Sequence, residues 1–136
     1  MGRGDNWMSQ FTSPLVVEHI SENEWIVKKS FEYHVGKYPS DEIIIVPKGF
    51  DTDFASIPKI FWGILPPTGP YGKAAVIHDY CYRTACYDRK TSDAIFLEGM
   101  TVLNVSEWNK VVIYYAVRWF GWRAWNQRRK EQHEHG

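Results

Sequence analysis

The hydrophobic residues of this chain change their spacing near residue 72, and this change constrains the fold more than any other feature. Before it, short β-branched and aromatic runs are separated by polar or proline-containing turns, as in antiparallel sheets. After it, residues 73–86 contain neither glycine nor proline, and their apolar side chains recur at the spacing of one helical face. The sequence therefore predicts an α+β fold, in which a small antiparallel sheet in the N-terminal half packs with three C-terminal helices.

Three runs in the first half predict strands. Residues 15–17 and 25–27 flank a polar cluster suited to a hairpin, and the second strand is expected to continue through Tyr33. Residues 43–46 form a continuous apolar run, which we interpret as a strand covered on both faces. Residues 50–72 fit neither period, and we expect a shaped, proline-rich loop there.

The second half predicts three helices, of which the first two form an antiparallel pair. The first covers residues 73–86. The second begins at Thr91 or Ser92, because either hydroxyl can N-cap a helix. The third begins near Ser106 and runs past Trp125 to a basic cluster, whose cations suit a helix C-terminus.

The size and composition indicate a folded protein. The chain has 136 residues, of which 44% are hydrophobic, and it contains seven Trp, eight Tyr and seven Phe. Such a chain can bury a core, which excludes a disordered solvating segment. We expect a single domain over residues 1–136, with a flexible tail at 1–11 and a frayed helical tail at 126–136.

The charges limit the classes of partner. Sixteen Lys and Arg residues balance sixteen Asp and Glu residues, so the chain lacks the basic field that dominates nucleic-acid binding, and nucleic acid is not an expected partner. Residues 71–136 are nevertheless locally basic, with ten basic and seven acidic side chains. There is no apolar leader and no long apolar run, so we expect neither a signal peptide nor a transmembrane segment.

Cys81 and Cys86 are too few for a disulfide scaffold or a four-cysteine zinc site. In an uninterrupted helix, their Cα atoms would lie about 8 Å apart at ~1.5 Å rise per residue, beyond the ~7 Å limit for a disulfide. We therefore expect reduced thiols, and a bridge between them would require the helix to break.

The strongest candidates for chemistry are His78, Asp79 and Asp93. Consecutive helical residues point about 100° apart, so His78 and Asp79 need separate partners. An antiparallel helix pair can bring the Asp93 carboxylate to one imidazole nitrogen, which leaves the other nitrogen to take a proton from water. The structural alternative is that Asp93 stabilises a first helical turn and that His78 is a core histidine bonded to a backbone carbonyl.

Three segments of the chain strongly resemble a family encoded by tailed phages and prophages, domain-of-unknown-function family 1353. They are residues 52–58 (TDFASIP), residues 69–80 (GPYGKAAVIHDY) and residues 89–100 (RK-x-x-DAIFLEGM). The resemblance covers roughly residues 10–121. It implies a phage origin and a small single-domain product, without an activity.

The spacing Ala-x-x-x-His78-Asp79-Tyr80-x-Tyr82-Arg83, followed by Asp93-x-x-Phe96-x-x-x-Met100, also resembles the paired-helix core of small prokaryotic secreted phospholipases A2. This resemblance implies that His78 is a general base and that Asp93 orients it. It further implies that Asp79, with Asp53 from an upstream loop, binds Ca²⁺. The implied activity is calcium-assisted ester hydrolysis at the host envelope, with a phospholipid surface as partner.

The third predicted helix is richer in aromatic residues than one buried stripe requires. Tryptophan interleaved with arginine is typical of protein interfaces, of membrane surfaces and of platforms for single-stranded nucleic acid, and core packing is the simpler alternative. The alternative function is thus a non-enzymatic virion component or host-protein modulator, located in the virion or the host cytoplasm, whose partner is a phage structural protein or a host protein. The candidate interface residues are Trp108, Trp119, Trp122, Arg123 and Trp125.

Overall fold

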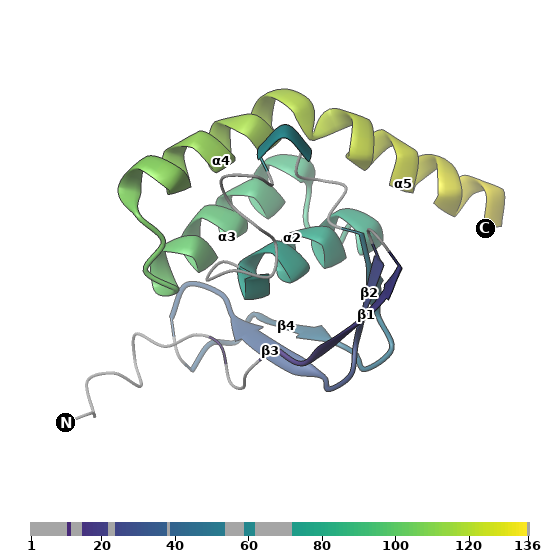
Figure 1. Cartoon of the computed structure of the whole chain (residues 1–136), viewed down its shortest axis with the longest axis horizontal. Helices are drawn as coiled ribbons and strands as arrows, with labels where there is room; N and C mark the ends of the chain where they lie inside the picture. Colours follow the sequence, from purple (N-terminus) through teal and green to yellow (C-terminus); the bar gives the residue numbers. More distant parts are fainter. Residues whose placement is uncertain are drawn as a thin grey trace. The chain divides into compact units, whose positions relative to one another are not determined.

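A computed structural model of the chain describes residues 11, 15–21, 24–37, 39–53, 59–61 and 72–135. Its backbone contacts group into two compact units, which we call the strand unit (Met1–Asp53) and the helical unit (Phe54–Gly136). Strands in the N-terminal half and helices in the C-terminal half confirm the predicted α+β class (Figure 1). The single domain over residues 1–136 stays a prediction.

The strand unit contains two antiparallel sheets. In the first, β2 (Glu24–Val27) lies between β1 (Val17–Ser21) and β5 (Asp51–Thr52), and β1 with β2 forms the predicted hairpin. The second sheet pairs β3 (Phe31–His34) with β4 (Ile43–Val46).

Two strand predictions are wrong. The second strand does not continue through Tyr33, because the chain bends at Lys28 and Lys29, and the alternation resumes in β3. Residues 51 and 52 are not loop, because they pair with β2 as β5. The remainder of the predicted loop, residues 54–58 and 62–71, lies outside the described residues.

The predicted burial of β4 on both faces is also wrong. Ile44 and Val46 are buried, whereas Ile43 and Ile45 are 42% and 53% exposed. The buried face is filled from β3, where Tyr33 lies opposite Ile44, and Phe11 extends this core with its ring 4.6 Å from the Tyr33 ring. Because one face of the two-stranded sheet is covered, the strand alternates between buried and exposed residues.

The helical unit contains a short 3₁₀ turn η1 (Lys59–Phe61) and the helices α2 (Gly72–Thr84), α3 (Arg89–Val102), α4 (Glu107–Phe120) and α5 (Trp122–His135). A short turn joins α2 to α3 as an antiparallel pair, and α4 and α5 follow one another along this pair (Figure 1). Its buried apolar side chains come from the facing sides of α2, α3 and α4, and include Ile77, Phe96, Met100, Ile113 and Val117.

The helix ends follow local hydrogen bonding. The start of the third predicted helix near Ser106 is confirmed, and Ser106 is the N-cap of α4, with its hydroxyl accepting from the Asn109 N–H at 3.3 Å. The predicted start of the second helix at Thr91 or Ser92 is wrong. Asp88 is the N-cap of α3, because its carboxylate accepts from the Thr91 N–H at 2.7 Å and an aspartate is at least as good a cap as a hydroxyl.

The predicted single third helix is divided at Gly121 into α4 and α5. A Cβ atom on Gly121 would lie 2.6 Å from the Tyr82 hydroxyl and 3.3 Å from the Arg89 guanidinium, so this close approach requires glycine. Arg89 also donates to the Val117 and Arg118 carbonyls at 3.1 Å, at the end of α4. The division thus falls where three helices meet.

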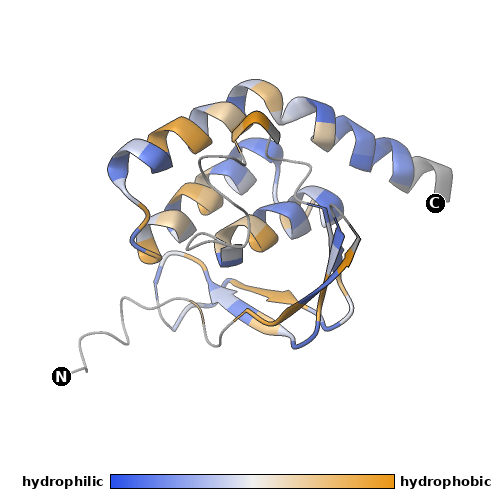
Figure 2. Cartoon of the chain, viewed as in Figure 1, coloured by the Kyte–Doolittle hydropathy of each residue, from blue (hydrophilic) through white to orange (hydrophobic). Residues whose placement is uncertain are grey.

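The last helix is predominantly polar, as Figure 2 shows. Its Arg129 guanidinium donates to the backbone carbonyls of Tyr82 at 2.5 Å and Arg83 at 2.9 Å, which belong to the last turn of α2 and lack helical partners. Within the described part of the chain, none of the helices has the length and apolar content needed to cross a membrane.

The turn after α2 generates a stability prediction. Ala85 has a φ of +53°, a left-handed conformation that is unfavourable for alanine by ~1–2 kcal/mol. We expect Ala85→Gly to raise the free energy of unfolding by about 0.5–1 kcal/mol, after the entropic cost of glycine is subtracted. Urea denaturation followed by circular dichroism measures this change.

The matched control is Ala94→Gly, because Ala94 is exposed in the interior of α3. There, glycine is expected to lower the free energy of unfolding by about 1 kcal/mol. Equal losses in the two variants would contradict the left-handed conformation at residue 85.

Candidate functional site

The His78 imidazole on α2 and the Asp93 carboxylate on α3 are in direct contact. Nε2 of His78 lies 2.6 Å from Oδ1 of Asp93, and both side chains have 0% exposure. The structure therefore forms the contact that the helix spacing predicts. The catalytic roles of these two residues stay predictions.

Asp93 binds three further side chains. The Tyr82 hydroxyl donates to Oδ1 at 2.7 Å, and Arg118 from α4 donates to Oδ2 at 2.6 Å. Arg89, one turn before Asp93 on α3, has Nη1 3.5 Å from Oδ2. Both carboxylate oxygens are therefore held by groups from the three helices α2, α3 and α4.

This environment keeps Asp93 ionised. Burial acts to raise the pKa of the carboxyl group, but the hydrogen bond and charge of His78, together with the hydrogen bonds from Tyr82 and Arg118, outweigh burial and hold the pKa below its ordinary value. The pKa of the Tyr82 hydroxyl changes in the opposite direction. Burial and the neighbouring Asp93 charge raise it well above its ordinary value.

The His78 ring is fixed by its neighbours as well as by the carboxylate. It stacks on Phe96 with ring centres 4.5 Å apart, and the Tyr82 ring lies 4.3 Å away. A carboxylate acceptor at Nε2 assigns the hydrogen to that nitrogen in the neutral ring. Asp93 itself lies in the second turn of α3, which begins at Arg89, so the interpretation as a first-turn carboxylate is wrong.

Asp79 has separate partners, as the helix geometry predicts. Its carboxylate is buried, with Oδ2 4.0 Å from Arg83 and Oδ1 3.6 Å from Arg128 of α5. These two guanidinium groups compensate its negative charge and oppose the approach of another cation.

Calcium binding by Asp79 and Asp53 stays a prediction. Ca²⁺ takes six to eight oxygen ligands, whereas the carboxylate of Asp79 faces two arginines. Asp53 directly follows β5. Among the residues that the structure describes, no group of three or more His, Cys, Asp or Glu side chains converges as a metal site.

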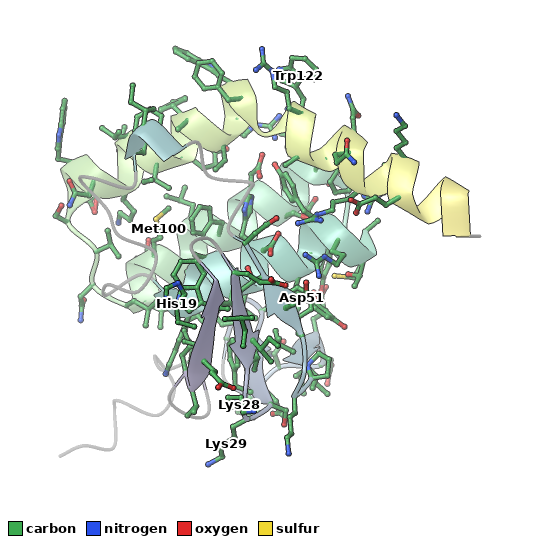
Figure 3. The ribbon with its side chains drawn as sticks, turned by 45° about the vertical axis from the view of Figure 1, so that its right-hand side comes forward. His19, Lys28, Lys29, Asp51, Met100 and Trp122 are labelled. Atoms are coloured by element: carbon green, nitrogen blue, oxygen red, sulfur yellow. The ribbon has the colours of Figure 1, made fainter. Side chains whose placement is uncertain are left out.

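Four of the five predicted interface residues lie at the surface of α4 and α5. Trp108, Trp119 and Trp122 are 76%, 68% and 48% exposed, and Trp122 points outward while Met100 lies among the helices (Figure 3). Arg123 is also exposed and lies 5.3 Å from the centre of the Trp122 ring. We call the exposed side chains of this surface the aromatic face: Trp108, Tyr115, Trp119, Phe120 and Trp122.

Trp125 has a different environment. It is half-buried, its ring meets the Tyr82 ring edge-on at 5.3 Å, and Arg129 lies 4.3 Å above its centre. It therefore packs within the helical unit, behind the tyrosine that binds Asp93, and does not belong to the aromatic face.

Several residues of the site were not predicted from the sequence. Tyr82 follows His78 by one helical turn, so its position on the same face was a usable signal. Arg118 is 25 residues from Asp93 along the chain, and Arg128 reaches Asp79 from the last helix, so no local pattern connects these pairs.

The depressed pKa of Asp93 generates a prediction for acid stability. The stabilisation is present above the unfolded-state pKa of about 3.9 and is lost as the pH falls through the lower pKa of the folded state. We expect Asp93→Asn to lower the free energy of unfolding by about 3 kcal/mol at pH 7, because it leaves the partly buried Arg89 and Arg118 without their buried counter-charge. Below pH 4, the free energy of unfolding should fall less in this variant than in the wild type.

Urea unfolding between pH 2 and pH 7 measures both effects. Asp41→Asn, which removes an exposed carboxylate, is the control and should follow the wild-type curve. If the free energy of unfolding of Asp93→Asn runs parallel to that of the wild type at all pH values, the ionised state of Asp93 is refuted.

The comparisons with known proteins identify a family. Residues 25–117 match the family described as "Protein of unknown function (DUF1353)". An uncharacterized protein, y4jT, of Sinorhizobium fredii (strain NBRC 101917 / NGR234), is 40% identical over 78 residues, which cover 56% of this chain and 23% of that protein. No solved structure matches the chain. Since the matched segment spans more than half of the chain and includes α2 and α3 with His78 and Asp93, the chain belongs to the DUF1353 family.

Proposed function

We propose that this protein is a hydrolase of carboxylic esters in which His78 is the general base and Asp93 orients it. The contact of 2.6 Å between Nε2 and Oδ1 is the observation that carries the proposal. The bonds from Tyr82 and Arg118 fix the carboxylate, and Phe96 fixes the imidazole plane. A base held in this way is preorganised for proton transfer.

The chemistry needs one proton to move twice. The His78 imidazole takes a proton from water, and the hydroxide adds to the ester carbonyl carbon. When the tetrahedral intermediate collapses, the bond to the alcohol oxygen breaks and the imidazolium returns the proton to that oxygen. Asp93 stays ionised throughout and stabilises the imidazolium, in the manner of the acid in other histidine-based hydrolytic sites.

The substrate class rests on resemblance. The motifs of α2 and α3 resemble those of small prokaryotic secreted phospholipases A2, which supports a phospholipid ester as substrate. The family resemblance supports a phage-encoded protein, and the phospholipase resemblance supports action at the host envelope. Because two arginines lie beside the Asp79 carboxylate, the proposed step is written without a metal ion.

Burial sets a condition on this proposal. The His78 side chain has 0% exposure, so water and substrate reach it only when the surrounding side chains separate. Access is therefore measured independently of turnover, by diethyl pyrocarbonate modification of the native protein and peptide mapping. Modification of His78 supports the proposal, and complete protection during reaction of the exposed His19 contradicts it.

We expect fatty-acid release from mixed phosphatidylethanolamine and phosphatidylglycerol vesicles, at equal rates with added calcium and with chelator. His78→Gln should lower the rate about a hundredfold or more, because the base is lost while an uncharged side chain stays in place. The control His19→Gln alters an exposed histidine of the strand unit and should keep the wild-type rate. Equal background release from all three proteins would end the proposal.

A second candidate function is favoured by the aromatic face. Its side chains are large and exposed, and Arg123 lies beside Trp122, a composition typical of the centre of protein interfaces. The C-terminal half is net basic, which favours a partner protein with an apolar groove and an acidic rim. On this proposal the protein is a non-enzymatic component of the phage particle. A modulator of a host protein would use the same surface.

We expect the double variant Trp119→Ser with Trp122→Ser to be lost from purified phage particles, because it removes the apolar centre of the contact. Quantitative mass spectrometry of the particles measures its incorporation relative to a major capsid protein. Ile45→Ser is the control, since it removes an exposed apolar side chain in the strand unit and should leave incorporation unchanged. Equal incorporation of both variants, or absence of the wild type from particles, contradicts the virion role.

A further inference from the structure

The two cysteines of the chain meet at the turn between α2 and α3. Their sulfur atoms are 3.6 Å apart, and both are free thiols. An uninterrupted helix would have separated them, but α2 ends at Thr84 and the left-handed Ala85 turns the chain back toward α2. The helix end that a disulfide between Cys81 and Cys86 requires is therefore present in the fold.

The two thiols have different environments. Cys81 is fully buried, whereas Cys86 is exposed. The hydrogen bond between them is the largest cause that lowers the pKa of Cys86 to about 6, and this contact together with burial raises the pKa of Cys81 far above its ordinary value. At neutral pH, a surface thiolate thus lies beside a protonated, protected thiol.

We propose that Cys86 and Cys81 form a thiol oxidation site for hydroperoxides, in which Cys86 reacts first and Cys81 closes an intramolecular disulfide. The Cys86 thiolate attacks one peroxide oxygen, the O–O bond breaks, and hydroxide or an alkoxide leaves. The resulting sulfenic acid is attacked by the Cys81 sulfur, which loses its proton as the S–O bond breaks and water leaves. Two thiols are oxidised, and one peroxide is reduced.

The geometry favours the second step. A disulfide has sulfur atoms about 2.05 Å apart, so they must approach by about 1.5 Å. Cys86 lies in the non-helical segment between α2 and α3 and can supply this movement, while Cys81 stays in its helix. Once Cys86 is oxidised, the thiolate that raised the pKa of Cys81 is gone, which makes the Cys81 sulfur a better nucleophile.

Peptide mapping tests the proposal directly, because Arg83 lies between the two cysteines. Trypsin separates residues 74–83, which contain Cys81, from residues 84–89, which contain Cys86. The wild-type protein is treated with hydrogen peroxide, blocked with iodoacetamide without reduction, and digested. We expect the two peptides to appear covalently linked, and the link to disappear after dithiothreitol.

Two variants separate the steps. In Cys81→Ser, Cys86 should accumulate as sulfenic acid, which dimedone traps, because no resolving thiol remains. In Cys86→Ser, neither dimedone adduct nor linked peptides should form, and this exposed substitution is expected to leave the fold intact. The rate of wild-type oxidation should rise with a midpoint near pH 6, following the pKa of Cys86.

Three results would overturn the proposal: no linked peptides and no adduct after peroxide treatment, overoxidation of Cys86 in the wild type without a link, or a dimer joined through Cys86. Each is read on the wild-type protein by the same digest and a non-reducing gel. The mapping does not depend on ester hydrolysis, so its result stands whether or not the proposed activity is found.

Discussion

The ionised carboxylate of Asp93 is the group on which the helical unit depends. A buried charge is strongly unfavourable unless it is paired and hydrogen-bonded, and Asp93 obtains its partners from three different helices. His78 and Tyr82 come from α2, Arg89 comes from α3 itself, and Arg118 comes from α4. The charge is satisfied only when these helices have assembled, which makes this network specific for one arrangement of them.

In this network, the contacts that stabilise the fold and the contact proposed for catalysis involve different oxygens of Asp93. Arg118 and Arg89 contact Oδ2 of Asp93, whereas His78 and Tyr82 contact Oδ1. The ion pairs at Oδ2 therefore hold the carboxylate in place while Oδ1 orients the imidazole. Loss of the carboxylate removes a structural centre, whereas loss of the imidazole removes a proton acceptor and leaves the ion pairs in place.

The parts predicted from the sequence are those governed by short-range periodicity. The contact of His78 with Asp93 follows from two helices joined by a short turn, and the hairpin of β1 and β2 follows from two runs around a polar cluster. Arg118 was missed because its pairing depends on how α4 lies against α3, and an exposed surface arginine has the same local sequence signal.

Errors at the element ends have a similar cause. Asp88, Thr91 and Ser92 are all good N-caps within one turn, and the choice among them depends on which one the chain can place beside a free N–H. The division at Gly121 depends on the distance to the Tyr82 hydroxyl, which belongs to a helix far away in the sequence. The exposure of Ile43 and Ile45 depends on the two-stranded sheet having one covered face, which an apolar run does not reveal.

The manner in which α5 is attached has a consequence for its behaviour in different solvents. Arg129 binds the end of α2 through backbone dipoles, and Arg128 reaches the Asp79 charge, whereas α4 is attached largely by buried apolar side chains. Dissolved ions weaken contacts between charges and dipoles but do not weaken apolar burial. Among the described helices, the C-terminal helix is therefore the one whose docking responds most to ionic strength, while the ring contact of Trp125 with Tyr82 and the buried pair of Arg128 with Asp79 keep it attached.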